Sequence, residues 1–195
     1  MSVSPDELGA RLTSLVAGAE ATVSFTQLTV DVPLEQWHDA AVATRDDAAV
    51  ACAFFDWLSA YDDSSEERPA TLAVVAHAWS NAHKHHVRLR THVSSVDGRL
   101  ATLTDVWPGA NWHERETFEM FGIVFDGHPN LVPLLLPDGF EGHPLRKDFI
   151  LASRVAKAWP GAKEPGESDH DTGGSPGRRR MLPPGVPAPG EWGPE

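Results

Sequence analysis

The stretch TLAVVAHAWSNAHKHHVRLRTHVSSVDGRLATLT, residues 71–104, is the clearest indication of the fold class in this sequence. Apolar side chains fill every second position over 72–76, and apolar residues or threonine do so over 87–93. Arginine or histidine stands between them in the second run. Such alternation predicts strands with one packed face and one solvated face, as antiparallel sheets permit. The dipeptide Ser-Asn at 80–81 predicts the turn that joins the two strands.

The residues upstream predict a helix followed by a strand. Ser4 and Glu7 have the spacing of a capping box, which predicts a helix that runs to about Ala21. The alternation then changes to a period of two over 22–32 and is interrupted at Gln27. We expect a strand with a bulge there.

Four further segments are predicted on either side of this stretch, before the last helix of the domain. A second helix is expected after Pro33, a strand buried on both faces at 49–58, and a solvated loop at 61–69. The Asp-Gly dipeptide at 97–98 predicts a hairpin turn into a strand at 100–104. This order of elements predicts the α+β class: a two-layer domain with a mixed, largely antiparallel sheet packed on helices.

The last predicted helix begins at Asn111, which has capping-box-like spacing to Glu114, and Gly122 is placed to end it. Half of the 16 prolines and half of the 16 glycines then fall in the last 36 residues. Such a segment buries too little apolar surface to offset its ordering entropy unaided. We therefore expect an α+β domain at 1–124, a non-regular interface segment at 125–159, and an extended or disordered Pro/Gly-rich C-terminal tail at 160–195.

Composition excludes several classes of protein. A net charge of -12 argues against a nucleic-acid binder, because phosphates would repel the chain. The single cysteine, Cys52, excludes an intramolecular disulfide and a cluster held by four thiolates. No export signal is visible at the amino terminus, and no apolar run approaches the roughly 18 residues of a membrane span. We expect a soluble, reduced, cytosolic chain.

The stretch FDGHPNLVPLLLPDGFEGHPLRKDF, residues 125–149, contains two copies of the pattern Phe-acid-Gly-His-Pro. The repeated histidines raise the question of a metal or acid/base site. Proline directly after each histidine fixes the backbone more than it presents an imidazole. The better metal candidates are His83 and His85, which would share a strand face, but zinc enzymes need a third protein ligand.

Other catalytic signatures do not occur in the sequence. It contains no P-loop, no dinucleotide-binding glycine motif after a strand, and no G-x-S-x-G nucleophile elbow. We expect Cys52 inside an apolar strand, where a thiolate is disfavoured. The residues alone therefore predict no catalytic, cofactor-binding or metal-binding residues, and a stand-alone hydrolase that uses His83 and His85 remains an alternative.

The block from residue 114 to residue 149 is specific enough to suggest a family. Its distinctive residues are Glu114-Arg115-Glu116, Glu119-Met120-Phe121-Gly122-Ile123, Phe125, Gly127-His128-Pro129, Leu134-Leu135, Pro137, Gly139-Phe140 and Gly142-His143-Pro144-Leu145-Arg146-Lys147-Asp148-Phe149. The block resembles the signature of the thirty-kilodalton subunit (the C subunit) of bacterial respiratory complex I, NADH:quinone oxidoreductase, and the resemblance extends more loosely back to about Leu28. Many members carry two basic residues where this chain has Val132 and Pro133.

The resemblance implies a non-redox subunit of the peripheral arm, on the cytoplasmic side of the cell membrane. It implies partners, chiefly subunits D and B, and no cofactor on this chain: FMN, the iron–sulfur clusters, NADH and quinone belong to partner subunits. The equivalent subunit of a related membrane-bound hydrogenase is the nearest rival, and an adaptor outside respiration, binding through the 160–195 tail, is a further alternative.

The resemblance also implies an interface role for the 125–149 stretch. We expect its glycines to allow tight turns, its prolines to fix the direction of the chain, and Leu131 and Leu134–Leu136 to offer apolar surface to a partner. Arg146 and Lys147 are expected to meet carboxylates or carbonyls across the interface. The expected interface and structural residues are Glu114, Arg115, Glu116, Phe121, Gly122, Gly127, His128, Pro129, Gly142, His143, Pro144, Leu145, Arg146, Lys147 and Asp148.

Overall fold

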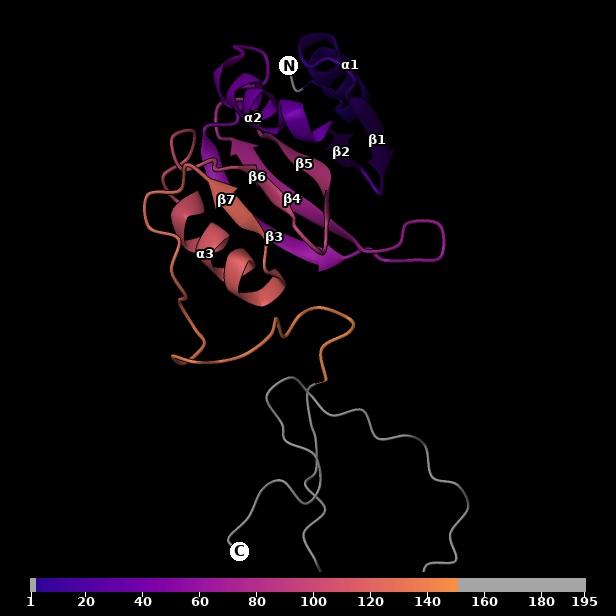
Figure 1. Ribbon diagram of the computed structural model, residues 1–195. Helices are drawn as coiled ribbons and strands as arrows, with labels where there is room; N and C mark the ends of the chain where they lie inside the picture. The colour runs from indigo at the N-terminus through magenta and orange to yellow at the C-terminus, as the bar shows by residue number, and fades with distance from the viewer. Residues whose placement is uncertain (1–2, 151–195) are drawn as a thin grey trace, which may run out of the picture. The chain divides into compact units, whose positions relative to one another are not determined.

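The computed structural model describes residues 3–150 (Figure 1). Within them, residues up to Lys147 form one compact unit. The 160–195 tail of the sequence prediction lies outside the described residues. The helices are α1 (Pro5–Leu15), the 3-10 helix η1 (Leu34–Gln36), α2 (Trp37–Asp46) and α3 (Ala110–Phe121); the strands are β1 (Glu20–Ser24), β2 (Gln27–Asp31), β3 (Phe54–Asp62), β4 (Thr71–Ser80), β5 (His85–Ser94), β6 (Arg99–Ala101) and β7 (Val124–Asp126).

Five strands form the main sheet, in the order β1-β2-β5-β4-β3. The β2–β5 pair is parallel and the other three pairs are antiparallel. β6 and β7 form a separate two-stranded parallel sheet. The predicted class, an α+β domain with a mixed and largely antiparallel sheet packed on helices, is confirmed.

One face of the sheet belongs to the hydrophobic core. Leu58, Ala76, Leu89 and Val30 lie side by side on neighbouring strands, and all are at most 2% exposed. Buried side chains of α1 and α2 join them in the same apolar cluster. Because side chains alternate along a strand, the next residues face the other way. We call that second side the open sheet face; Trp57, His77, Arg88, Thr29 and Thr22 lie side by side across it.

The first predicted helix is shorter than expected, and the predicted bulged strand is a hairpin. The capping box of Ser4 and Glu7 is present, but α1 ends at Leu15 rather than near Ala21. Residues 22–32 do not form one strand, because Phe25 and Thr26 have positive φ angles and turn the chain between β1 and β2. Two central turn residues with positive φ fit the twist of a β-hairpin.

The prediction of a strand buried on both faces at 49–58 was wrong. β3 begins only at Phe54, extends to Asp62, and is an edge strand whose Phe54 is 53% exposed. The apolar residues before it lie in a turn segment that inserts Val50 and Cys52 into the core. An apolar run of this length is compatible with either arrangement.

Two predictions in the later part of the domain were also wrong. The Asp-Gly dipeptide at 97–98 does not make a hairpin, because β6 pairs with β7 rather than with β5. The α3 helix has Gly109 at its N-cap with no side-chain cap, so Asn111 lies inside the helix. Gly122 does end the helix, in the left-handed conformation, as expected.

Helix α3 lies against the edge strand β3. His113 of α3 reaches the backbone of that strand: its Nδ1 is 3.1 Å from the carbonyl oxygen of Leu58. Phe55 packs its ring against His113 and Trp107. A covered edge protects a sheet from pairing with other chains. The packing also fixes α3, which carries the residues of the candidate site.

Candidate functional site

The Gly/Pro segment, defined here as residues 127–147, is fastened to the C-terminal end of α3. The last four carbonyl groups of a helix lack partners within it. Here all four are bonded: Phe118 O accepts from the N–H of Gly122, and the other three accept from the second Gly-His-Pro unit and the two residues after it. The three contacts are His143 Nδ1 to Glu119 O at 2.9 Å, Leu145 N to Met120 O at 3.2 Å, and Arg146 Nε to Phe121 O at 2.6 Å.

Gly122 makes this arrangement possible. Its φ of +73° is one that glycine adopts without strain. A Cβ at this position would lie 2.8 Å from Cδ2 of His143 and 2.7 Å from Nη2 of Arg146. The helix end and the segment therefore approach more closely than a residue with a side chain allows.

Glu119 anchors the middle of the segment. Its carboxylate accepts hydrogen bonds from the backbone N–H groups of Leu134 (3.2 Å), Leu135 (2.9 Å) and Leu136. Burial by itself would raise the pKa of Glu119, but these backbone donors outweigh burial and hold the pKa below its ordinary value. The side chain is therefore a buried carboxylate that orders three consecutive residues of the segment.

Arg115 binds the segment one turn earlier on the helix. Its Nε donates to Val132 O at 2.9 Å and its Nη2 to Pro133 O at 3.1 Å. Its guanidinium also lies 5.3 Å from the ring centroid of Trp112. These two carbonyls belong to the two positions at which the sequence departs from the family resemblance. Because Arg115 uses backbone oxygens, the contact does not require a particular side chain there.

The first Gly-His-Pro unit meets the other end of α3. The His128 imidazole is fully buried, with Nε2 3.2 Å from Asn111 O and 4.0 Å from the Glu114 carboxylate. Glu114 accepts from Leu103 N at 2.6 Å and from the Thr102 hydroxyl. Burial raises the pKa of Glu114 to about 7. Glu114 therefore links α3 to the chain after β6.

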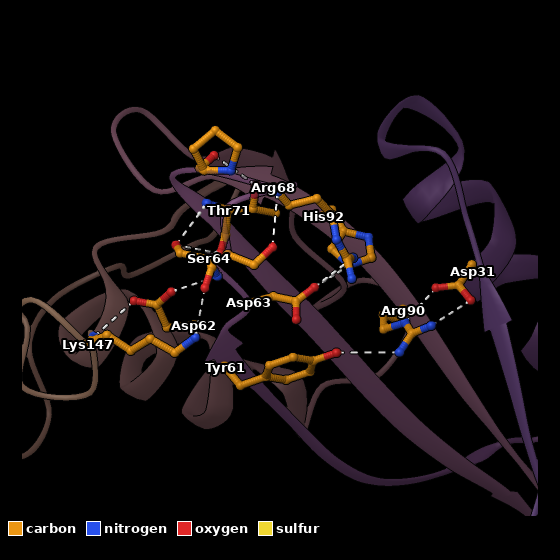
Figure 2. A network of polar contacts seen from close by, with 12 residues as sticks. Asp31, Tyr61, Asp62, Asp63, Ser64, Arg68, Thr71, Arg90, His92 and Lys147 are labelled. Carbon is orange, nitrogen blue, oxygen red and sulfur yellow. Dashed lines mark hydrogen bonds and ion pairs between the residues drawn. The ribbon is translucent and has the colours of Figure 1, made fainter.

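The end of the segment is held by the sheet. The Lys147 backbone N–H donates to Asp62 at 2.9 Å, and its Nζ donates to Ser64 O at 2.9 Å (Figure 2). We expected Arg146 and Lys147 to reach across an interface. Each of them donates at least one hydrogen bond to an acceptor of its own chain.

The remaining predicted residues are distributed as follows. Phe121 is in the core, Glu116 is half-buried on α3, and Gly127 and Gly142 have φ angles of 84° and 89°. Pro129 is exposed and Pro144 is half-buried. Asp148 is exposed and lies directly after the compact unit that ends at Lys147. Glu119 was absent from the predicted interface set, although it lies inside the recognised block.

The outer side of the segment carries exposed apolar side chains. Val132 is 44% exposed, Leu135 60%, Phe140 42% and Leu145 55%. Leu131 instead packs on the core, and Leu134 and Leu136 are half-buried. A hollow of about 250 Å³ lies beside them, between Phe118 of α3 and the segment. A rigid backbone thus displays apolar surface and a hollow next to it.

His83 and His85, the candidate metal ligands, are both bonded to backbone carbonyl groups. His83 Nε2 is 3.0 Å from Ala48 O and His85 Nε2 is 2.6 Å from Val50 O, so both imidazoles bind the turn before β3. Among residues 3–150, no group of three histidine, cysteine or acidic side chains could hold a metal ion. Cys52 lies in that turn segment rather than in a strand, and burial raises the pKa of its thiol to about 12.

The fold and the segment together define a class: an α+β domain whose last helix is capped and covered by a long Gly/Pro segment of the same chain. A sequence model of the family described as "Respiratory-chain NADH dehydrogenase, 30 Kd subunit" matches residues 30–155. The chain belongs to this family, as the resemblance predicted.

Individual relatives agree with the family. A protein of Roseiflexus castenholzii, named as the C subunit of NADH-quinone oxidoreductase, is 44% identical over 126 residues, which cover 65% of this chain and 71% of the relative. A protein of the same name from Bordetella petrii is 38% identical, over 73% of this chain and 75% of the relative.

Solved structures share the fold. A trypsin-resistant fragment of Nqo5 is 27% identical, with a TM-score of 0.54, over 66% of this chain and all of the fragment. A chain of an archaeal membrane-bound sulfane sulfur reductase has a TM-score of 0.61 over 75% of this chain and 85% of its own. At 20% identity, the second likeness concerns the fold alone. No helix within residues 3–150 is long and apolar enough to cross a membrane.

Proposed function

We propose that the chain is a non-redox structural subunit of the peripheral arm of proton-translocating NADH:quinone oxidoreductase. It has no catalytic centre and no cofactor of its own, and FMN, the iron–sulfur clusters, NADH and quinone are bound by its partners. Subunits D and B are the proposed neighbours. The complex holds the chain at the cytoplasmic side of the cell membrane as a peripheral component.

One observation carries this proposal: the Gly/Pro segment exposes large apolar side chains although its backbone is bonded to α3 at residues 132–136 and at Leu145. An isolated protein gains nothing from exposing Leu135 or Leu145, whereas protein interfaces are built around buried apolar anchors. Because the backbone is already ordered, a partner that covers these side chains does not have to order the segment. The hollow next to Phe140 is large enough to receive a partner side chain.

We assign a supporting role to the polar residues that join α3 and the segment. Arg115, Glu119, His143 and Arg146 make their hydrogen bonds to backbone groups of their own chain. Under this proposal they fix the shape of the surface that the partner meets, and the exposed apolar side chains provide the contact.

Affinity purification of the tagged full-length chain from detergent-solubilised membranes tests the proposal. We expect a set of cluster-bearing subunits together with a flavoprotein, and cross-links from the segment to subunits D and B. Recovery of the chain alone would contradict the proposal. A nickel-containing subunit in place of the flavoprotein would instead assign the chain to the hydrogenase-type complex.

A further inference from the structure

The open sheet face contains a cleft away from the Gly/Pro segment. Its volume is about 470 Å³, and strands β1 to β5 all contribute to its lining. The residues that matter for its chemistry are Thr29, Trp57, Tyr61, Val75, Arg88 and Arg90. None of the described residues that line the cleft is acidic, although the whole chain has a net charge of -12.

The two arginines of the cleft differ in their partners. Arg90 is neutralised within the chain: its Nη2 donates to Asp31 at 2.8 Å, and its Nη1 lies 3.4 Å from the Tyr61 hydroxyl (Figure 2). Arg88, two residues earlier on the same face of β5, has a buried Nε with no hydrogen-bond partner among the described residues. A buried charged donor without an acceptor is costly, and native proteins rarely keep one without a reason.

The neighbouring groups cannot provide the missing acceptor. His77 and His86 lie beside Arg88 on the open sheet face and bond to each other at 2.8 Å. The Asp56 carboxylate is 2.7 Å from His77 Nδ1 and is used there. Burial, followed by the nearby positive groups, lowers the pKa of His86, which is consistent with a cationic local potential. Within residues 3–150, no carboxylate is therefore bonded to the buried Nε of Arg88.

The composition around Arg88 is that of a protein-binding surface. Trp79 is 37% exposed and Tyr61 is 41% exposed, and both lie on the open sheet face. Tryptophan, tyrosine and arginine are the residues most enriched at the energetic centres of interfaces. A carboxylate is the natural partner of a guanidinium, because two parallel N–H groups match its two oxygens.

We infer that this cleft is a second docking surface, which receives an aspartate or glutamate side chain from a neighbouring subunit and pairs it with Arg88. The inference rests on the proposed function, because the neighbour is a subunit of the same complex. The acidic side chain enters between Trp57 and Tyr61, and the exposed aromatic rings pack against the segment that carries it. This contact is distinct from the one proposed for the Gly/Pro segment.

Substitution of Arg88 tests the inference through two readouts that move in opposite directions. Arg88→Met removes an unpartnered buried donor, so the isolated full-length chain is expected to unfold at the same temperature as the wild type or higher. The same variant is expected to leave the solubilised complex about tenfold faster, because a charge-assisted hydrogen bond is lost. Arg88→Lys, which keeps the charge but not the two parallel N–H groups, should restore only part of the binding. The matched control is Arg11→Gln, because Arg11 lies on α1, outside the cleft, and is bonded to Asp47.

Cross-linking with the native residue at Arg88 keeps the test independent of folding defects. A benzophenone side chain at Tyr61 is expected to capture one subunit of the complex, at a peptide that contains an acidic residue. The same group at Val96, 83% exposed in the turn after β5, is the control position. Capture of lipid only, of a second copy, or of residues 151–195 of the same chain would overturn the inference. So would equal release rates for Arg88→Met and the wild type.

The two proposals fail in different ways. If the wild-type chain recovers no other subunits, the proposed function is wrong. If the wild type and Arg11→Gln recover the full complex and Arg88→Met does so with the same release rate, only the docking surface is wrong.

Discussion

Gly122 and His143 meet where the end of α3 touches the second Gly-His-Pro unit, and there is no room for a side-chain atom between them. The left-handed φ of Gly122 and the hydrogen bond from His143 to Glu119 O belong to one arrangement. A Cβ at position 122 would lie 2.8 Å from Cδ2 of His143. The capping of the helix and the path of the segment are therefore coupled.

The first prediction uses a matched pair of glycines. Gly122→Ala adds backbone strain and displaces His143 and Arg146, so we expect a loss of roughly 3 kcal/mol in the free energy of unfolding. Gly139 has a similar φ of +79° but no atom within 4 Å of the added Cβ. Gly139→Ala should therefore cost only the strain, about 1 kcal/mol. Urea unfolding of both variants measures the difference, and equal losses would refute the coupling.

The second prediction concerns Glu119. Glu119→Gln replaces one acceptor oxygen by an amide that faces backbone donors, so the N–H groups of Leu134 to Leu136 lose a partner. We expect a loss of roughly 2 kcal/mol and faster protease cleavage within residues 130–140. Glu116→Gln, on the same helix, is the control. Hydrogen exchange at Leu135 unchanged by Glu119→Gln would show that the carboxylate does not order the segment.

The third prediction is a pH dependence. The unfolded chain releases the Glu114 proton near its ordinary pKa of 4.5, whereas burial raises the folded pKa to about 7. The folded state therefore binds more protons between these values, and the contribution of Glu114 to stability falls as pH rises through this window. The change is on the order of 3 kcal/mol.

Comparison of the wild type with Glu114→Gln isolates that contribution. The lowered pKa of His86, caused first by burial, acts in the opposite direction below about pH 6.5, and it is present in both proteins. We expect the difference in unfolding free energy between the two proteins to shift in favour of the variant from pH 5 to pH 8. A constant difference would mean that Glu114 is not buried as a protonated acid.

Alternation of side chains was enough to predict the fold class, because β5 alternates between buried and half-buried residues as expected. The solvated face predicted for the neighbouring strand was wrong, since β4 is buried on both faces from Leu72 to Ala78. The wrong predictions of turns and strand pairing concern segments whose structure depends on contacts that the local sequence does not indicate. Phe25 and Thr26 form a hairpin turn without the glycine or asparagine that usually marks one. The pairing of β6 with β7 joins residues that are more than twenty positions apart, and no local signal specifies it.

The candidate site was recognised only through the family resemblance. The sequence block contains Arg115, Glu119, His143 and Arg146, but their acceptors and donors are backbone atoms 15 to 25 residues away. Periodicity carries no information about such contacts. For this reason the hydrogen bond from Arg146 Nε to the Phe121 carbonyl was not predicted, and the interface role expected for Arg146 stays a prediction.

The most direct test of the account is Leu135→Asp, because Leu135 is 60% exposed on the segment and its substitution spares the hydrogen bonds that hold the backbone. We expect the isolated chain to unfold at the wild-type temperature, the amount of assembled complex to fall about tenfold, and the turnover per assembled flavin to stay unchanged. Val96→Asp, exposed but outside the segment, should assemble normally. A normal amount of complex with altered turnover, or no change in either quantity, would contradict a structural role for this surface.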